Sequence, residues 1–221
     1  MKWAARPAAA MFFAVLAVSA LAEEEGERLA RRAFKHAAVV EVDGKVAGTA
    51  VPVRHGGKVL YMTCAHVAKP LDPITGKLRL AKEKPDGSLE KVPAKVLRQA
   101  DVEKGEPDLA LLEVTEGSLD LEIAELATEP PVAGQPVYHA GACFGKISYM
   151  QGHVSRAKYF EAGQEYVQLS SMLAPGSSGG PVFEKNGKLL GVSHSTVPGF
   201  ASWCIPASVI RAWLGKKPDK K

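Results

Sequence analysis

The chain has 221 residues, of which 46% are hydrophobic and 24% are charged, and its formal net charge is +4 at pH 7. This length supports one globular unit with a sizeable core and leaves no room for a second large domain. The first 22 residues hold two of the 28 basic residues and no acidic one, so 26 bases face 24 acids in the remainder. A balance this close to neutral gives no indication of a nucleic acid partner.

Residues 1–22 have the three parts of a secretory signal. Lys2 and Arg6 form a basic start, residues 8–18 are apolar, and small residues follow up to Ala22. The apolar run is shorter than the roughly 18–20 residues that span a bilayer, so we expect cleavage after Ala22 rather than a retained anchor. The sequence therefore predicts an exported protein, periplasmic or secreted, with no membrane span after signal cleavage.

Short strand-like runs dominate the rest of the chain. A charged helix over residues 23–36 is followed by expected strands at 37–42, 45–53, 58–63, 91–97, 109–114, 135–140, 152–158, 165–169, 181–183, 188–193 and 201–205. The second expected helix covers residues 206–214, because Pro206 begins it and Ile210 and Trp213 share one face. Strands of this length and spacing are typical of an all-β barrel or sandwich.

Two segments have the composition of irregular structure. Residues 70–90 are rich in Pro, Lys, Asp and Gly, and we expect them to form a surface loop. Residues 116–131 are acidic and then rich in proline. We interpret this second segment as the connection between two β lobes, with a boundary near residue 130.

The three cysteines give no sign of a metal centre. Cys64, Cys143 and Cys204 are an odd number, so at most one internal disulfide can form. Each has apolar neighbours, which favours a small buried thiol. No two of them have the short spacing of a structural zinc site, and the histidines are scattered. We therefore expect no metal and no cofactor.

The strongest chemical signal surrounds Ser178, in the segment PGSSGGP at residues 175–181. Covalent hydrolysis of an amide needs a hydroxyl on a tight turn, where the carbonyl can approach and free backbone N–H groups can meet the developing oxyanion. Glycines on both sides of Ser178 permit that approach. A flexible linker would not lie between two prolines and run into the strand-like Val182 and Phe183, so we interpret Ser178 as a nucleophile.

A nucleophilic serine needs a base, and a histidine base needs a carboxylate that fixes its tautomer. His66 stands at the end of the apolar run 61–65, where its ring can point out of a rigid element. Asp108 directly precedes the apolar run 109–112. Alone, each is more often structural. Together, the order His66, Asp108, Ser178 predicts a catalytic triad.

These three segments resemble those of the trypsin-like (chymotrypsin-fold) serine proteases. The likeness is closer to the bacterial high-temperature-requirement-type proteases and the glutamyl endopeptidases. It rests further on four short segments, GACFG at 141–145, GHVS at 152–155, LGV at 190–192 and CIPAS at 204–208. It extends from about Val39 to Leu214.

The resemblance implies two antiparallel six-stranded β-barrels with the triad in the cleft between them. A domain at 23–214 would then comprise a first barrel at about 37–130, a second at about 131–205 and a helix at 206–214, before a basic tail at 215–221. It also implies a serine endopeptidase that forms an acyl-enzyme with protein or peptide substrates. The backbone N–H groups of Gly176 and Ser178 would form its oxyanion hole. Ser177 replaces the aspartate that pairs with a new N-terminus in digestive members, so we expect signal removal to suffice for activity.

The substrate pocket is assigned only by the resemblance. Its base would be lined by Met172, Leu173 and Ala174 and its wall by Ser193, His194 and Ser195. No acid stands at the base, which argues against Lys or Arg, since burying an unpaired cation is costly. Apolar lining favours a small or medium aliphatic side chain. His194 could instead favour an acidic side chain, or it could be structural.

Two rival functions use the same residues. Residues 176–180 also match the nucleophile elbow of α/β-hydrolases, but that fold places a helix after the serine and an acid and a histidine downstream, in that order. Here Pro181 and a strand follow, which excludes it. A catalytically silent, protease-like binding module of the cell envelope is the remaining alternative, because a fold alone does not establish a function.

Overall fold

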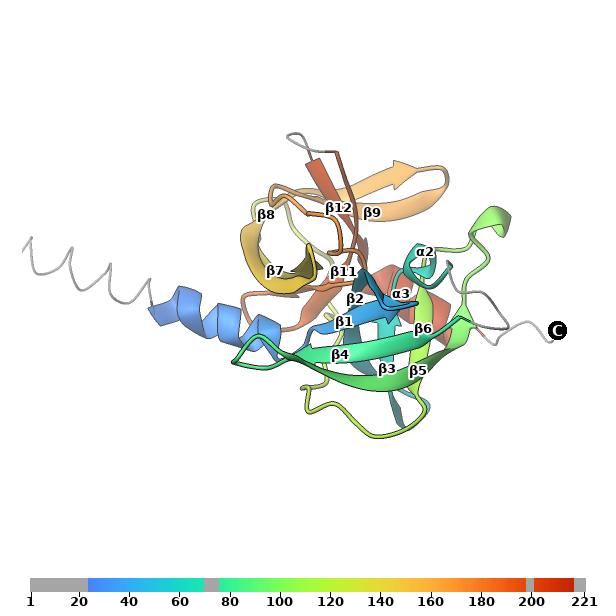
Figure 1. Cartoon of the computed structure of the whole chain (residues 1–221). Coiled ribbons are helices and arrows are strands. Elements are labelled where there is room, and N and C mark those ends of the chain that lie inside the picture. The colour runs from blue at the N-terminus through green and yellow to red at the C-terminus, as the bar shows by residue number, and fades with distance from the viewer. Residues whose placement is uncertain (1–23, 70–75, 198–200, 217–221) are drawn as a thin grey trace, which may run out of the picture.

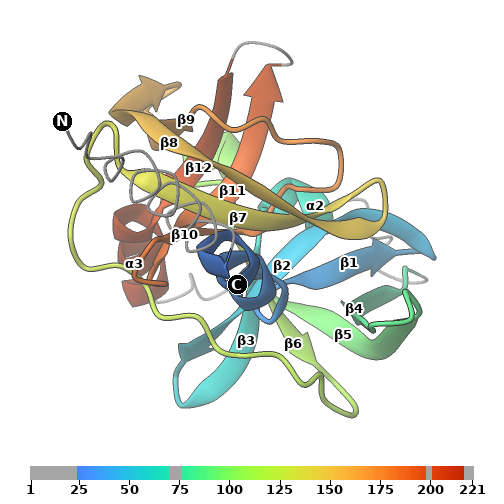
Figure 2. The same cartoon turned by 90° about the vertical axis from the view of Figure 1, so that its left-hand side faces the viewer.

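The computed structural model consists mainly of two closed β-barrels of six strands each (Figures 1 and 2). It describes residues 24–69, 76–197 and 201–216. All strand pairs within the two barrels are antiparallel. The predicted all-β fold of two barrels with a C-terminal helix is confirmed. The expected signal peptide and the end of the basic tail lie outside the described residues.

The first barrel has the strand order β1-β2-β3-β6-β5-β4, and β4 pairs back with β1. Its strands are β1 (Ala38–Val42), β2 (Lys45–His55), β3 (Lys58–Thr63), β4 (Leu78–Glu83), β5 (Leu89–Gln99) and β6 (Ala110–Val114). The one-turn helix α2 (Ala65–Ala68) follows β3, and a short 3-10 helix, η1 (Val102–Lys104), lies between β5 and β6. Both connections lie on the side of the barrel that carries the site described below.

The second barrel has the strand order β10-β11-β12-β9-β8-β7, and β7 pairs back with β10. Its strands are β7 (Pro136–Cys143), β8 (Lys146–Glu161), β9 (Gln164–Leu169), β10 (Pro181–Glu184), β11 (Leu189–Val197) and β12 (Ala201–Pro206). Helix α3 (Ala207–Gly215) continues directly from β12. Its residues Ile210 and Trp213 are buried as expected, and Trp213 packs under the guanidinium of Arg98 from the first barrel.

The prediction of a surface loop over residues 70–90 is wrong for residues 78–83 and 89–90, which form strands, and residues 70–75 lie outside the described residues. Strand β4 lies within it and pairs with both β1 and β5, and β5 begins at Leu89. Leu78 and Leu80 are buried while Arg79 between them is exposed, which is the period of two expected of a strand. The alternation is short, and the prolines and charged residues around it made the whole segment resemble a loop in composition.

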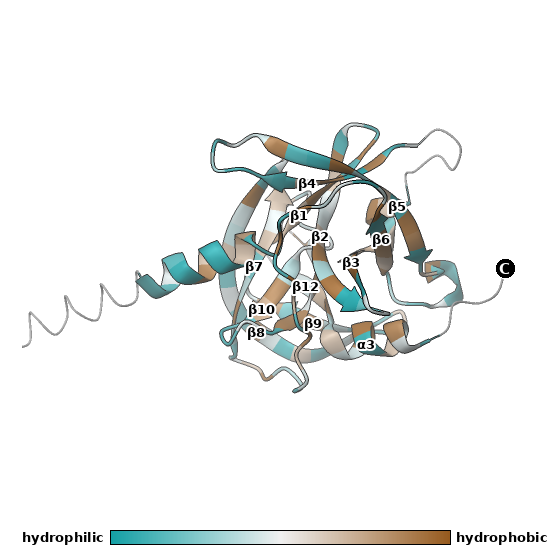
Figure 3. Cartoon of the chain, turned by 90° about the horizontal axis from the view of Figure 1, so that it is seen from below, coloured by the Kyte–Doolittle hydropathy of each residue, from teal (hydrophilic) through white to brown (hydrophobic). Residues whose placement is uncertain are grey.

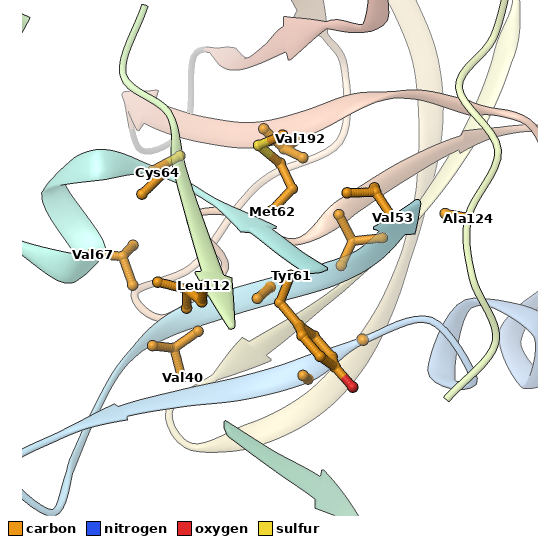
Figure 4. Packing of buried hydrophobic residues seen from close by; sticks show 14 of the residues in the cluster. Val40, Val53, Tyr61, Met62, Cys64, Val67, Leu112, Ala124 and Val192 are labelled. Atoms are coloured by element: carbon orange, nitrogen blue, oxygen red, sulfur yellow. The ribbon is translucent and has the colours of Figure 1, made fainter. Parts of the chain in front are cut away.

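One hydrophobic cluster joins the two barrels and holds them in register. It includes residues of β1–β6 together with members of β7, β10, β11, β12 and α3. Figure 4 shows Met62 of β3 against Val192 of β11, and both are fully buried. Because interiors are close-packed, a shared core of this kind fixes the position of groups carried by opposite barrels.

A helix over residues 24–34 precedes β1 and lies on the opposite side of the molecule from α2 (Figure 1). Most of it is hydrophilic, as Figure 3 shows, but Leu29 and Ala33 are buried in the shared core. Lys35, just beyond it, pairs with Glu122 at 2.7 Å. None of the described helices is long and apolar enough to cross a bilayer.

Candidate active site

His66 is presented to solvent by the single turn of α2. Its neighbours Ala65, Val67 and Ala68 are buried, so the one exposed position of the turn is His66, whose side chain is 47% accessible. The three buried side chains hold the backbone of this turn in place, and the exposed imidazole can contact residues from other parts of the chain.

Asp108 binds His66 at two points. Its Oδ2 lies 2.5 Å from His66 Nδ1, and its Oδ1 accepts the His66 backbone N–H at 2.9 Å. Asp108 is only 7% exposed because the buried start of β6 follows it. This arrangement assigns the Nδ1 proton to the side facing the carboxylate and leaves Nε2 as the free acceptor.

His194 is a second imidazole on the same carboxylate. Its Nε2 lies 3.1 Å from Asp108 Oδ2, and its Nδ1 lies 2.8 Å from Ser195 Oγ. Burial raises the pKa of Asp108, but hydrogen bonds from His194 and His66 outweigh burial and hold this pKa well below its usual range. Asp108 therefore stays ionised, as a partner of an imidazolium must.

The loop that carries Ser178 is a glycine-dependent turn before β10. Gly176 and Gly179 have φ angles of +95° and +82°, which a side chain would oppose. The Ser178 hydroxyl donates to the backbone carbonyl of His194 at 3.0 Å. Within the described ranges Ser178 makes no hydrogen bond to His66, and its hydroxyl instead contacts the residue that also contacts Asp108.

Two backbone amides of this loop have no acceptor among the described residues, namely those of Gly176 and Ser178. The carbonyl of Pro175 belongs to the same trans peptide as the Gly176 N–H and therefore points away from it, and it accepts the N–H of Phe144 at 3.1 Å. Free amides beside a serine hydroxyl are the arrangement that stabilises an oxyanion. They are the two amides that the family resemblance assigns to an oxyanion hole, and that role stays a prediction.

A cleft of about 620 Å³ lies beside His66 and Asp108. Its walls come from α2, residues 99–106, β9 and β11, so both barrels contribute to it. A cleft that is open to solvent and bordered by the imidazole gives an extended chain access to the base.

The six residues expected in the substrate pocket do not behave alike. Met172 and Ser195 are exposed, while Leu173 and Ser193 are buried. Ala174 is half-buried, and its carbonyl accepts the N–H of Ser177. Of the six, only His194 lines the cleft. Its Nε2 contacts the carboxylate of Asp108, and its Nδ1 contacts Ser195 Oγ, so both ring nitrogens have partners within the protein.

All three cysteines are free thiols. Burial raises the pKa values of Cys64 and Cys204, so both remain protonated and unreactive. Ligand atoms of Cys64, His66 and Asp108 lie within 4.8 Å of one another. The Cys64 thiol donates to the carbonyl of Ser193, and Asp108 is occupied by its imidazoles, so hydrogen bonds account for this cluster.

Sequence reasoning missed a second serine–histidine pair in the second barrel. His139 Nε2 lies 2.9 Å from Ser171 Oγ. His139 is fully buried, and burial lowers its pKa to about 4. The described residues place no carboxylate on its Nδ1, which has no partner. Its position in the middle of the apolar strand β7 was the available signal that this histidine points inward.

The comparisons with known proteins agree with this architecture. The family model of the trypsin-like peptidase domain matches residues 48–192. Serine protease HTRA1 of Xenopus tropicalis is 26% identical over 171 residues, which cover 73% of this chain and 34% of that protein. The chain therefore matches about a third of the length of this curated relative.

Two solved structures share the fold. Deg5 has a TM-score of 0.68 at 20% identity, covering 86% of this chain and 92% of that one. The inactive form of a variant of Rv3671c from M. tuberculosis H37Rv has a TM-score of 0.64 at 18% identity, covering 82% and 86%. Together with the family match over most of its length, these findings show that the chain belongs to the trypsin-like peptidase domain family.

Proposed function

We propose that the protein is a serine endopeptidase that hydrolyses peptide bonds through an acyl-enzyme on Ser178. The observation that carries this proposal is the pairing of an imidazole held at two points by Asp108 with two free amides on the serine loop. The binding-module alternative requires neither feature. Protein or peptide substrates follow from the open cleft and from the family, and residues 1–22 would direct the protein to an envelope compartment or out of the cell.

The first half of the reaction forms the acyl-enzyme. The Ser178 hydroxyl turns from the carbonyl of His194 to His66 Nε2, which takes its proton while Oγ attacks the substrate carbonyl carbon. The carbonyl oxygen becomes an oxyanion and accepts hydrogen bonds from the amides of Gly176 and Ser178. His66 then gives the proton to the leaving nitrogen, the C–N bond breaks, and Ser178 carries the acyl group as an ester.

The second half repeats these steps with water. His66 Nε2 takes a proton from a water molecule, whose oxygen attacks the ester carbon and forms a second oxyanion at the same two amides. Return of the proton to Ser178 Oγ breaks the ester and releases the carboxylic acid product. Asp108 remains ionised throughout and stabilises each imidazolium that forms.

Hydrolysis of a fluorogenic peptide library by the purified protein tests this proposal. We expect cleavage by the wild type and a loss of about 10⁶-fold in kcat for Ser178→Ala, the size of effect that removing a triad nucleophile has produced elsewhere. Ser171→Ala is the matched control, because Ser171 also contacts a histidine, and it should retain activity. Cleavage that survives Ser178→Ala, or that Ser171→Ala abolishes, would refute the assignment.

A further inference from the structure

Thr49 of β2 contacts the serine loop across the interface between the barrels. It is fully buried, and its backbone N–H donates to the carbonyl of Ser178 at 2.8 Å. Its hydroxyl lies 2.7 Å from the carbonyl oxygen of Gly176 and 2.7 Å from the backbone nitrogen of Ala142. One residue of the first barrel thus touches two separate segments of the second.

The direction of both hydroxyl contacts follows from the chemistry of the partners. The N–H of Ala142 can only donate, so Thr49 Oγ1 accepts it. The hydroxyl proton is then directed at the Gly176 carbonyl, which can only accept. Ala142 lies near the end of β7, beyond residues 137–139, which pair with β10. Its N–H therefore has no acceptor in β10 and donates to the hydroxyl of Thr49 instead.

Gly176 needs such a contact because glycine has no side chain to restrict its backbone. Its φ of +95° is one of many angles open to glycine, and only outside contacts select it. The peptide before Gly176 is held by the bond from the Phe144 N–H to the Pro175 carbonyl. The peptide after it is held by Thr49 and by the bond from the Ser177 N–H to the Ala174 carbonyl.

We propose that Thr49 is a positioning residue for the oxyanion hole: its hydroxyl fixes the peptide that follows Gly176 and thereby keeps the Gly176 N–H directed at the reacting oxygen. The inference rests on the proposed serine endopeptidase function. Without the hydroxyl, the carbonyl of the half-buried Gly176 loses this donor and the buried Ala142 N–H loses its acceptor. Rotation of the peptides that flank Gly176 can then change the direction of its N–H. Thr49 does not itself touch the substrate.

The test compares Thr49→Val, which keeps the shape and removes the hydroxyl, with Thr49→Ser, which keeps the hydroxyl. We expect Thr49→Val to lower kcat by up to about 100-fold, because small displacements near a reacting group have effects of this size, with little change in KM. Thr49→Ser should restore kcat. Val53→Ala is the stability control, since it opens a cavity in the same strand at the far end, near Ala124 (Figure 4).

A second measurement distinguishes a specific loss of oxyanion stabilisation from a general disturbance of the substrate-binding site. A peptide aldehyde based on the best library substrate adds to Ser178 Oγ, whose proton passes to His66, and the aldehyde oxygen becomes an oxyanion. We expect Thr49→Val to weaken aldehyde binding by the same factor as it lowers kcat. Binding of the corresponding peptide alcohol, which has no carbonyl or carboxylate oxygen to place in the oxyanion hole, should not change between Ser178→Ala backgrounds with and without Thr49→Val.

Unchanged kcat and aldehyde affinity in Thr49→Val would overturn the inference, as would a loss that Thr49→Ser fails to rescue or that Val53→Ala reproduces. If Thr49→Val does not fold, Thr49→Ala gives the same comparison. Failure of the proposed function itself would be visible earlier, as a wild-type protein that neither cleaves peptides nor binds the aldehyde. That outcome overturns both proposals.

Discussion

His194 and Asp108 are joined by a contact of 3.1 Å between Nε2 and Oδ2, so the carboxylate that orients His66 is shared by two imidazoles. The backbone carbonyl of His194 also accepts the resting hydroxyl of Ser178. One residue of β11 is therefore in contact with both Asp108 and Ser178. The centroid of its ring lies 5.8 Å from that of the His66 ring, and the two rings are nearly perpendicular.

Replacing the His194 ring tests its support of Asp108. His194→Phe keeps a ring of similar size and removes the donor, and we expect kcat to fall by about 10- to 150-fold, since a hydrogen bond to a charged group contributes roughly 1.5–3 kcal/mol. His194→Gln retains an N–H donor and should recover part of the loss. Steady-state kinetics on one peptide measures both. Equal activity of His194→Phe and the wild type would show that the contact does not matter.

Asp108→Asn should lower kcat by about 10⁴-fold, because an amide in place of the carboxylate favours the wrong tautomer of the histidine base. The NH2 group of the new asparagine is a donor and cannot accept a hydrogen bond. It must nevertheless face either the backbone N–H of His66 or the two imidazoles. KM should change little. A variant with more than a tenth of wild-type kcat would mean that the short contact to His66 is not used in turnover.

Gly176→Ala should abolish most activity through the oxyanion hole alone. A Cβ at this position would lie 2.1 Å from the carbonyl oxygen of Ala142, so the loop must shift, and loss of one oxyanion donor typically costs about 10²–10³ in kcat. Gly44→Ala is the matched control, because its φ is also positive, at +78°, and a Cβ there meets open space. It should lower stability without changing kcat. If the two variants are equally active, the loop does not form the hole.

Stability should fall as the pH is lowered from about 6.5 to about 4. Burial lowers the pKa of His139 from 6.5 to about 4, so in this window the unfolded chain binds a proton that the folded protein does not. The folded state then loses on the order of 3 kcal/mol at the acid end. His36 contributes in the same direction, because burial lowers its pKa too.

Urea denaturation at several pH values measures this slope, and His139→Gln serves as the comparison. The variant lacks the titrating group, so its free energy of unfolding should depend less on pH between 4 and 6.5. The same slope in both proteins would show that His139 titrates normally in the folded state.

Much of this architecture could be predicted from the sequence because apolar strands, turn glycines and the PGSSGGP segment are local signals. The short apolar runs of β2 and β3, which are buried without alternation, and the spacing of Ile210 and Trp213 needed no tertiary information. Strand β4 could not be recognised so easily, because only two buried leucines stand among charged residues, and its pairing with β1 supplies the missing stabilisation.

The support around the site depends on contacts that sequence cannot display. His194 was placed in the substrate pocket by resemblance, and only the folded chain shows its ring beside Asp108. The same holds for Thr49, which looks like an ordinary strand threonine until the barrels meet and its hydroxyl reaches Gly176. Local sequence motifs indicate which residues are candidates for the reaction. The residues that orient these candidates lie far from them along the chain, so no local motif includes them.

Modification by a peptide phosphonate, followed by intact mass and peptide mapping, tests the central claim most directly. Such a reagent phosphonylates a serine only when a base removes the hydroxyl proton and free amides hold the phosphoryl oxygen. We predict one adduct per chain, located on Ser178, which is absent in Ser178→Ala and strongly slowed in Asp108→Asn. A wild-type protein that acquires no adduct, or acquires it on Ser171 or another residue, would contradict the account.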